Sequence, residues 1–559
     1  MEVAQYRKRW RSIVNGQPPH QILYQSKWMI DHGEQTPGIL PALFILILTS
    51  SVLFYAAAIY HNTYWRRRGI PGPPPIPFFG NIKDWWEHQG YGFKLREWTN
   101  LYGKVYGIQQ GWKNILIVSD LDMLQELFTK KFEHFHTRKL VPASGNVDTE
   151  PRVNIFGARG ARWKRLRAIA NPVFSVNNLK KVMPIIEDSV CAFLGFMDKV
   201  SEGSEEIDIR VYFHELTMDI ICRIALGQKD TRQFENKYTA VAQQAFARIG
   251  RSKVMRLSWM FPWLGGGLRR ITMLVGRLRK DPFMEFFKQI DLEVKCRKEL
   301  RNSKNFDTND ANPKQETVDF IDLFLDAESD EVVNLVQANT FNKAATKVDK
   351  KLTSDEITAQ CILFLLAGFE TTANSLANTC YNLMNNPQCQ KRLQDEIDEF
   401  CPEQPSYEQL SQMKYLDAII RETLRLHPTG AALACARTCT ETTTLGKYTV
   451  ESGTIVQADP FSIHYDQELW GGDAEQFKPE RWLESTTDRH PLAWFPFGSG
   501  PRNCIGFRLA YLEEKLALFH LFRKYTVLDC PQPENQPNHR GANREQVIVK
   551  LKRREHTNF

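Results

Sequence analysis

The stretch Phe497–Gly506, FGSGPRNCIG, places one cysteine among glycine, proline and arginine residues, directly before an apolar, helix-like run. A thiolate is a strong metal ligand, provided that its surroundings keep it deprotonated. A helix that begins after Cys504 would favour negative charge at its N-terminal end. Gly506 and the other loop glycines would let backbone N–H groups approach the sulfur, and Phe497 could shield it from water. The pattern therefore predicts a metal-ligating cysteine.

The other cysteines narrow the choice of metal. The chain has 11 cysteines, which are scattered, without a C-x-x-C pair and without a second cysteine or histidine at zinc-binding spacing. This distribution argues against a disulfide scaffold and against a structural zinc site. A lone cysteine in a glycine-rich loop fits a metal whose remaining ligands come from a cofactor, and haem iron is the main candidate. The alternative is a buried cysteine in an ordinary turn between a loop and a helix.

The full loop also matches the pattern F-x-x-G-x-R-x-C-x-G, with Phe497, Gly500, Arg502, Cys504 and Gly506 at its fixed positions. Five fixed positions match by chance in a chain of this length on the order of once in ten thousand. The loop resembles the haem-binding loop of the cytochromes P450. This resemblance implies haem b as the cofactor, the thiolate of Cys504 as the axial ligand of its iron, and Arg502 as a partner of a haem propionate.

A second motif resembles the oxygen-activation motif of the same family. It is AGFETT, which lies in a long apolar run, where a charged residue is costly unless it serves a purpose. Glu370 and Thr371 form an acid–alcohol pair that could relay the two protons that oxygen activation consumes. Gly368 would leave room for a ligand. The resemblance implies that Glu370 and Thr371 are catalytic. The alternative is a threonine-rich helix turn with a surface acid.

Further motifs of the family involve arginine. The pattern W-x-x-x-R at Trp163 and Arg167 resembles a helix that binds the haem propionates, and Arg437 matches another propionate-binding position. A guanidinium suits a carboxylate because it binds in a bidentate manner. By resemblance, all three residues bind the cofactor. The alternative for each arginine is an ordinary surface charge.

The motif ETLR places Glu422 and Arg425 on one face of a helix, since they are three residues apart. Together with Arg481 in FKPERW, they resemble the structural Glu–Arg–Arg network of the family. A pair at this spacing is by itself also common as a solvated ion pair.

The N-terminal part of the chain predicts four regions: a basic extension over 1–38, a transmembrane anchor over 39–60, a basic stop and proline-rich hinge over 61–81, and a haem-thiolate monooxygenase domain over 82–559. The anchor carries no charge and is long enough to cross a hydrocarbon core of about 30 Å. The three arginines after it favour a cytosolic catalytic domain on a single-pass protein. The long apolar run leads us to expect the endoplasmic reticulum membrane. Mitochondria are the alternative, because an extension that is rich in arginine and poor in acids resembles a transit peptide.

The expected fold is mainly α with small β-sheets, as in the cytochrome P450 fold: one large haem-binding domain with an N-terminal transmembrane helix. Thr353 and Glu356 form a capping-box pattern at the start of a long apolar helix, which Pro387 would end. Strand-like runs lie at 104–120 and 442–459. The motifs look closest to the animal clan that contains the drug-oxidising family three and thromboxane synthase.

The resemblance implies a monooxygenase that inserts one oxygen atom of O2 into an apolar small molecule, such as a xenobiotic, steroid or fatty acid. Electrons would come from an NADPH-dependent reductase, with cytochrome b5 as a further donor. The chain's basic residues could present a positive face to that acidic partner: Arg162, Lys164, Arg165 and Arg508. By resemblance, the region 247–290 would roof the substrate pocket and enter the membrane.

Two other functions remain open. One is a haem-thiolate isomerase that rearranges peroxides, although such chemistry needs no proton relay. The other is a haem-binding membrane protein without turnover. The net charge of +7 is too small to argue for nucleic acid as a partner, and it is compatible with an acidic protein or with membrane lipid.

Overall fold

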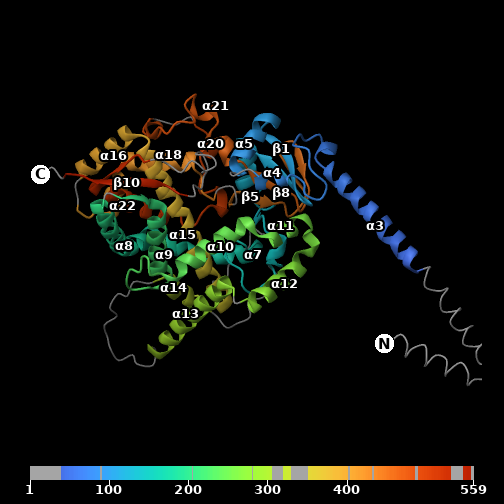
Figure 1. Cartoon of the computed structure of the whole chain (residues 1–559), viewed down its shortest axis with the longest axis horizontal. Coiled ribbons are helices and arrows are strands. Elements are labelled where there is room, and N and C mark those ends of the chain that lie inside the picture. The colour runs from blue at the N-terminus through green and yellow to red at the C-terminus, as the bar shows by residue number, and fades with distance from the viewer. Residues whose placement is uncertain are drawn as a thin grey trace, which may run out of the picture. The chain divides into compact units, whose positions relative to one another are not determined.

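The structure is a computed structural model of the whole chain (Figure 1). It describes residues 39–87, 91–203, 205–279, 281–304, 319–328, 351–400, 403–430, 434–484, 489–530 and 546–555. The basic extension predicted over 1–38 lies outside the described residues. The chain divides after Tyr64 into an N-terminal unit and a large body, Trp65–Phe559.

The N-terminal unit contains the helix α3, Ile39–Asn62, which is long and apolar enough to cross a membrane. Most of its residues are uncharged aliphatic or aromatic side chains, interrupted by the small hydroxyl residues Thr49, Ser50 and Ser51. A helix of this composition suits lipid on all sides. This helix covers the residues expected for the anchor.

The body is mainly helical, as expected. Its principal helices are α5 (Tyr91–Tyr102), α7 (Gly160–Ala170), α8 (Val176–Gly203), α9 (Ile209–Leu226), α10 (Lys237–Arg251), α11 (Lys253–Met260), α12 (Gly265–Leu278), α13 (Pro282–Lys304), α14 (Phe320–Leu325), α15 (Ser354–Met384), α16 (Pro387–Phe400), α17 (Tyr407–Gln412), α18 (Lys414–Leu426) and α22 (Phe507–Lys524). A large apolar core lies between α8, α9, α15 and α22, where most of their inward side chains are fully buried.

Helix α15 runs through this core and organises it. The capping box predicted at its start is present, because the Thr353 hydroxyl accepts from the Glu356 backbone N–H and the Glu356 carboxylate accepts from the Thr353 N–H. Its 31 residues give a length of about 46 Å. The helix ends at Met384, and Pro387 begins α16 rather than closing α15.

Small sheets flank the helices. One has the strand order β1 (Val105–Gln110), β2 (Lys113–Val118), β8 (Ile455–Ala458), β5 (Ala436–Thr438) and β3 (Thr137–Arg138). Another has β4 (Glu206–Asp208), β10 (Ile548–Arg553) and β9 (Tyr525–Leu528), and β6 (Thr443–Leu445) pairs with β7 (Tyr448–Val450). The strands predicted in 104–120 and 442–459 are confirmed. The pairing of β3 with β5 matters most for the site, since it sets Arg138 directly opposite Arg437.

The proline-rich segment is extended and packs along β1. Gly107 donates its N–H to the Pro71 carbonyl at 2.8 Å, and Asn81 donates its own to the Gln109 carbonyl at 2.7 Å. The Gly107 carbonyl would lie only 2.0 Å from a Cβ at Gly72, so only glycine fits there. The segment is therefore fixed to the sheet of the body.

Candidate functional site

The cysteine loop is a tight turn that only glycine permits at two positions. Gly498 and Gly500 both have positive φ angles, 72° and 70°. A Cβ at Gly500 would lie 2.1 Å from the Phe128 carbonyl oxygen. The Cys504 N–H donates to the Phe497 carbonyl at 2.8 Å and closes the loop. The backbone thereby holds the cysteine in one position just before α22.

Cys504 is an exposed residue of the loop, although many protein atoms surround its sulfur. Burial raises the pKa of this thiol, while a hydrogen bond from the Gly506 backbone N–H and the charges of Arg138 and Arg167 lower it. Burial outweighs the lowering effects. A bound metal ion would complete the deprotonation, because coordination removes the thiol proton outright.

Three arginines from distant parts of the chain lie near this loop: the buried Arg437 on β5, the buried Arg502 in the loop itself, and the half-buried Arg138 on β3. Arg138 donates to the Arg502 carbonyl at 2.8 Å. Burial lowers the pKa of Arg138 to about 9 and that of Arg437 to about 10. Among the described residues, none of the three forms an ion pair with a carboxylate.

Several of their N–H groups have no partner within the described part of the chain: Nε of Arg138, Nε and Nη2 of Arg437, and Nε of Arg502. Buried unpaired donors are costly, so three such side chains together indicate a missing anionic group. The two propionates of haem fit this cradle. Arg138 was not predicted from the sequence, because only the strand pairing brings it opposite Arg437.

The two residues predicted on α7 have different contacts. Trp163 is buried, and the guanidinium of Arg502 lies 4.6 Å from its ring centre. Arg167 donates to the backbone carbonyl of Asn503 at 2.8 Å and to its side-chain oxygen at 2.9 Å. Arg167 therefore ties α7 to the residue before Cys504. Its predicted contact with a propionate stays a prediction.

The side chains of the acid–alcohol pair of α15, Glu370 and Thr371, have different partners and do not contact each other. The Thr371 hydroxyl donates to the Ala367 carbonyl one turn earlier, at 2.7 Å. Glu370 faces α9, where Arg210 donates to its Oε1 at 2.7 Å and His214 Nε2 lies 3.2 Å from its Oε2. Burial alone would raise the pKa of Glu370, but the hydrogen bond and charge of His214 and the charge of Arg210 lower it to about 2.

Gly368 has a different role from the one expected. A Cβ at this position would lie 3.2 Å from the side chain of Ile221 on α9, so the glycine allows close helix packing rather than space for a ligand. Leu363, Ala367 and Thr371 are spaced four residues apart on one face of α15 and are at least partly accessible, as are Leu366, Gly368 and Glu370.

The predicted Glu–Arg–Arg network is present and deeply buried. Arg425 donates to both oxygens of Glu422 at 2.8 Å, and Arg481 donates to Oε1 at 2.9 Å. Trp482 and the Lys478 backbone complete the carboxylate's hydrogen bonds. Because every charge in it is paired, loss of one partner would cost ~3–5 kcal/mol.

The expectation of an exposed basic face is wrong for Arg162 and Arg165. Arg162 and Arg165 both bind the buried carboxylate of Glu356, at 2.9 and 2.7 Å, and their side chains are only 3% and 6% exposed. These two arginines join α7 to the start of α15. Arg508 is exposed.

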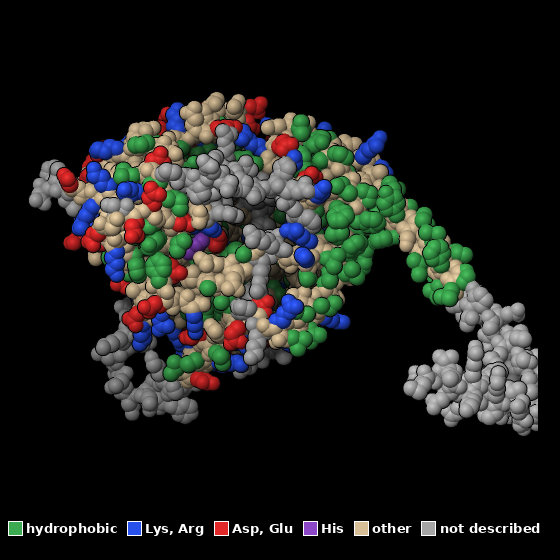
Figure 2. Space-filling view, viewed as in Figure 1, with side chains coloured by type: hydrophobic (Ala, Val, Ile, Leu, Met, Phe, Trp, Pro, Cys, Tyr) green, Lys and Arg blue, Asp and Glu red, His purple; other side chains and the backbone are tan. Residues whose placement is uncertain are grey.

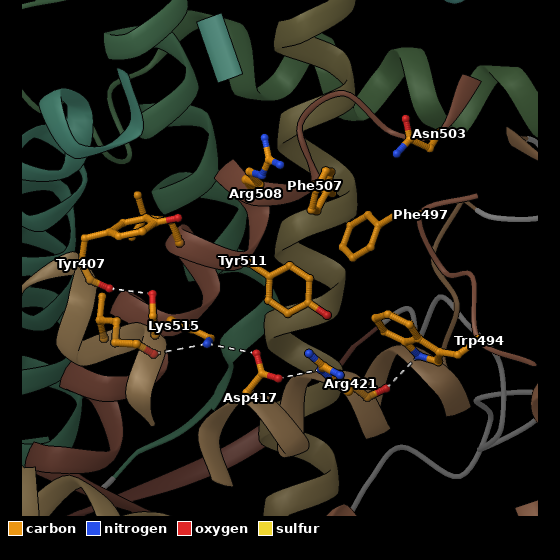
Figure 3. A pocket seen from close by; sticks show the side chains of 13 residues that line it. Tyr407, Asp417, Arg421, Trp494, Phe497, Asn503, Phe507, Arg508, Tyr511 and Lys515 are labelled. Carbon is orange, nitrogen blue, oxygen red and sulfur yellow. Dashed lines mark hydrogen bonds and ion pairs between the residues drawn. The ribbon is translucent and has the colours of Figure 1, made fainter. Parts of the chain in front are cut away.

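A surface cleft of about 390 Å³ opens beside Arg508 and the cysteine loop (Figure 3). Phe497 lies at its edge, 5.5 Å from the ring of Tyr511. Asp417, which also lines the cleft, pairs with Arg421 at 2.6 Å and with Lys515 at 3.0 Å. The cleft thus combines aromatic walls with an excess of positive charge.

Comparison with known proteins agrees with these features. A family model described as cytochrome P450 matches residues 70–556. The chain is 40% identical over 493 residues to the cytochrome P450 CYP13A10 of Caenorhabditis elegans, an alignment that covers 86% of this chain and 93% of that protein. It is also 39% identical over 509 residues to cyp-13B1 of the same organism, covering 89% and 96%. The similarity extends over nearly the whole body.

Proposed function

Because this chain belongs to the cytochrome P450 family, we propose that Cys504 is the axial ligand of its haem iron and that Arg138, Arg437 and Arg502 hold the haem propionates. Members of this family are monooxygenases that bind haem through a cysteine thiolate. The observation that carries the assignment is the set of unpaired, buried arginine N–H groups beside the cysteine loop. The Trp163 ring would support the guanidinium of Arg502, and the backbone N–H of Gly506 would donate to the sulfur of Cys504.

Haem, when bound, supplies the binding and two-electron reduction of O2. The remaining work falls to the protein, which must bring two protons to the oxygen that leaves as water. We assign this delivery to Glu370 and Thr371. Their support is the accessible face of α15 that carries Thr371, and the adjoining carboxylate held by Arg210.

The proposed substrate is an apolar small molecule. Leu363 and Ala367 give the accessible face of α15 an apolar surface beside Thr371. Gly430, which follows α18, would place a Cβ 3.9 Å from the Thr371 methyl group. A face of small and apolar side chains favours an apolar guest over a charged one.

An NADPH-dependent flavoprotein reductase is the proposed electron donor, and the cleft of Figure 3 supports its docking. Arg508 provides exposed positive charge beside the cysteine loop, in place of the buried Arg162 and Arg165. Such charges steer an acidic partner and raise its association rate. We expect Arg508→Glu to raise the reductase concentration needed for half-maximal turnover, and to do so less at high salt. An unchanged reductase dependence would contradict this docking face.

We place the protein in the endoplasmic reticulum membrane, with its body in the cytosol. The apolar helix α3 and the three arginines that follow it support this orientation. A second feature is α12, whose exposed side chains are largely apolar. In Figure 2, hydrophobic side chains gather on the side of the body that carries α11 and α12, with basic side chains beside them. This surface suits the interface of a membrane.

The carbon monoxide difference spectrum of the reduced protein tests the central assignment. We expect a red-shifted Soret band in the natural chain that is lost in Cys504→Ala. The matched control is Cys435→Ala, because Cys435 is buried close to the same loop, with its sulfur 3.5 Å from a Cβ position at Gly498. A band that survives in Cys504→Ala and disappears in Cys435→Ala would overturn the ligand assignment.

A further inference from the structure

The cleft beside the cysteine loop is walled by aromatic side chains. The Phe497 ring lies 5.5 Å from that of Tyr511 and 6.1 Å from that of Phe507, and the three rings lie next to one another in Figure 3. Trp494 and Tyr407 also line the cleft, and all five residues are half-buried. Such walls favour a planar aromatic guest, because aromatic rings pack well in offset or edge-to-face arrangements.

The charged side chains of the cleft are mostly cationic. Its cations are Arg421, Arg508 and Lys515, and its one carboxylate belongs to Asp417. That carboxylate already pairs with Arg421 and Lys515. Arg508 is exposed, its guanidinium lies 5.1 Å from the ring centre of Phe507, and it forms no ion pair within the described structure. The cleft can therefore take a further negative charge directly beside an aromatic wall.

The walls of the cleft are held in place by contacts among three elements. The Trp494 Nε1–H donates to the backbone carbonyl of Arg421 on α18 at 3.3 Å, and Lys515 on α22 donates to the Leu410 carbonyl on α17 at 3.2 Å. The volume of the cleft, about 390 Å³, lies in the range of small-molecule pockets. A site that is formed before the ligand arrives costs less to occupy.

We propose that this cleft binds a small, planar aromatic carboxylate. The ring of the ligand packs against Phe497, Phe507 and Tyr511, and its carboxylate pairs with Arg508. A guanidinium matches a carboxylate in both charge and geometry, so the site prefers an acid to a neutral molecule of the same shape. The binding is a property of the cleft itself and goes beyond the proposed function.

A ligand in this cleft also affects electron transfer. Phe497 and Asn503 of the cysteine loop line the cleft, and the ligand covers Arg508, the charge that we assign to docking of the reductase. It should therefore slow reduction of the haem by the reductase and leave reduction by a small reductant unchanged. This consequence rests on the proposed electron donor, whereas the binding does not.

The test uses naphthalene-2-carboxylate as the probe, with the full-length, haem-loaded protein in detergent. The fluorescence of the probe reports its binding. We expect saturable binding that weakens as the salt concentration rises, because one contact is an ion pair near the surface. Naphthalene-2-carboxamide, which has the same shape and no charge, should bind at least about threefold more weakly. Binding that does not saturate would overturn the inference.

An apolar pocket above the haem is an alternative place for an aromatic probe. A parallel titration therefore contains 1-phenylimidazole, which ligates haem iron and fills that space. We expect the affinity for naphthalene-2-carboxylate to be the same with and without this compound. Loss of binding in its presence would place the probe at the haem and would show that the inference is wrong.

Two variants each remove one component of the site. Arg508→Gln removes the charge, and Tyr511→Leu removes an aromatic wall but keeps an apolar side chain. Each should weaken binding of the carboxylate at least about threefold, and only Arg508→Gln should remove the preference for the acid over the amide. The matched control is Arg277→Gln, because Arg277 is equally exposed but lies on α12, away from the cleft. It should bind the probe as the natural chain does.

The Arg508 variant decides the question if Tyr511→Leu does not fold, because an exposed arginine without an ion pair in the described structure contributes little to stability. Equal affinities of Arg508→Gln and the natural chain for naphthalene-2-carboxylate would contradict the proposed site. So would an equal loss of affinity in Arg508→Gln and Arg277→Gln, since the effect would then be one of overall charge.

A second readout separates this inference from the proposed docking of the reductase. The rate of haem reduction, followed by the carbon monoxide band, is measured with the reductase and with dithionite. The probe should slow only the first reaction, because dithionite needs no docking face. If binding depends on Arg508 but neither rate changes, the inferred site stands and the proposed docking face is wrong. If both rates fall equally, the probe acts at the haem and the inference is wrong.

Discussion

Individual arginine side chains carry the strongest chemical signal in the body. Arg138 and Arg437 lie opposite each other on paired strands and are enclosed by protein, with N–H groups that have no partner in the described residues. Two like charges held together out of water destabilise the fold by themselves. Such an arrangement is understandable when an anion neutralises it. The same side chains should therefore have opposite effects in the protein with and without haem.

We predict that Arg437→Leu weakens haem binding and stabilises the haem-free protein. A hydrogen bond to a charged group contributes about 1.5–3 kcal/mol, so haem affinity should fall about 10-fold or more. In the absence of haem, removal of an unpaired buried charge should raise the thermal unfolding midpoint. Haem content per chain and the unfolding midpoint of the haem-free protein measure the two effects.

The control is Arg152→Leu, because Arg152 is exposed and already paired with Asp291 and Asp355. It should change neither haem content nor the haem-free midpoint by much. If Arg437→Leu lowers the stability of the haem-free protein and leaves haem content unchanged, Arg437 is a structural residue and the cradle has been misassigned.

At the scale of elements, α22 is unusual because it carries two adjacent buried acids, Glu513 and Glu514. The helix itself begins directly after the cysteine loop. Burial raises the pKa of Glu514 to about 8, and burial also raises the pKa of Glu513. Within the described chain, neither residue forms an ion pair. Burial therefore favours the neutral form of both carboxyls in the folded protein.

We predict that Glu514→Gln stabilises the protein at neutral pH and has no effect in acid. The unfolded glutamate ionises near 4.5, whereas the folded one keeps its proton up to about pH 8. The contribution of Glu514 to the free energy of unfolding is therefore fully present below about pH 4.5. It is lost as the pH rises toward 8, at a total cost on the order of 4 kcal/mol. Glutamine does not titrate, so the variant should lack this loss. Thermal unfolding between about pH 4 and 8 measures it.

Glu399→Gln provides the control, since Glu399 is exposed on α16. Its unfolding midpoint should follow the natural chain at each pH. A stabilisation by Glu514→Gln that is equal at pH 4 and pH 8 would mean that the carboxyl does not titrate in this range, contrary to the prediction.

For the molecule as a whole, the body and the apolar helix α3 are separate units. The body has its own apolar surface on α12, where Ile271, Leu274 and Leu278 are 60%, 59% and 76% exposed. These residues follow a three- and four-residue spacing and share one face of the helix. A soluble body would not need such a surface. Membrane contact is consequently expected even without α3.

We predict that a chain beginning at Trp65 still binds vesicles of mixed neutral and anionic phospholipid, and that replacing Ile271, Leu274 and Leu278 together by aspartate removes most of this binding. The physical reason is the loss of apolar area together with repulsion from anionic lipid. Co-sedimentation with the vesicles measures the bound fraction.

The matched control replaces three scattered, exposed apolar residues by aspartate: Leu101, Val211 and Leu483. This variant has the same added charge and should keep most of its membrane binding. If the two triple variants bind equally, α12 is not the membrane contact of the body.

Sequence by itself determined those features that depend on neighbours along the chain. The capping box of Thr353 and Glu356, the pairing of Glu422 with Arg425, and the glycine-dependent turn before Cys504 are all local, so spacing and residue type were sufficient to predict them. The apolar helix α3 was equally readable, because membrane-spanning length is a property of one segment.

Tertiary structure alone decided which distant side chains meet. Arg138 reaches Arg437 through strand pairing, and His214 meets Glu370 through helix packing. The same packing takes Arg162 out of solvent to bind Glu356. The charge of each residue was visible in the sequence, but its partner was not. The reason is physical: the effect of a charge depends on burial and on the charges around it, and both arise only when segments far apart in the chain come together.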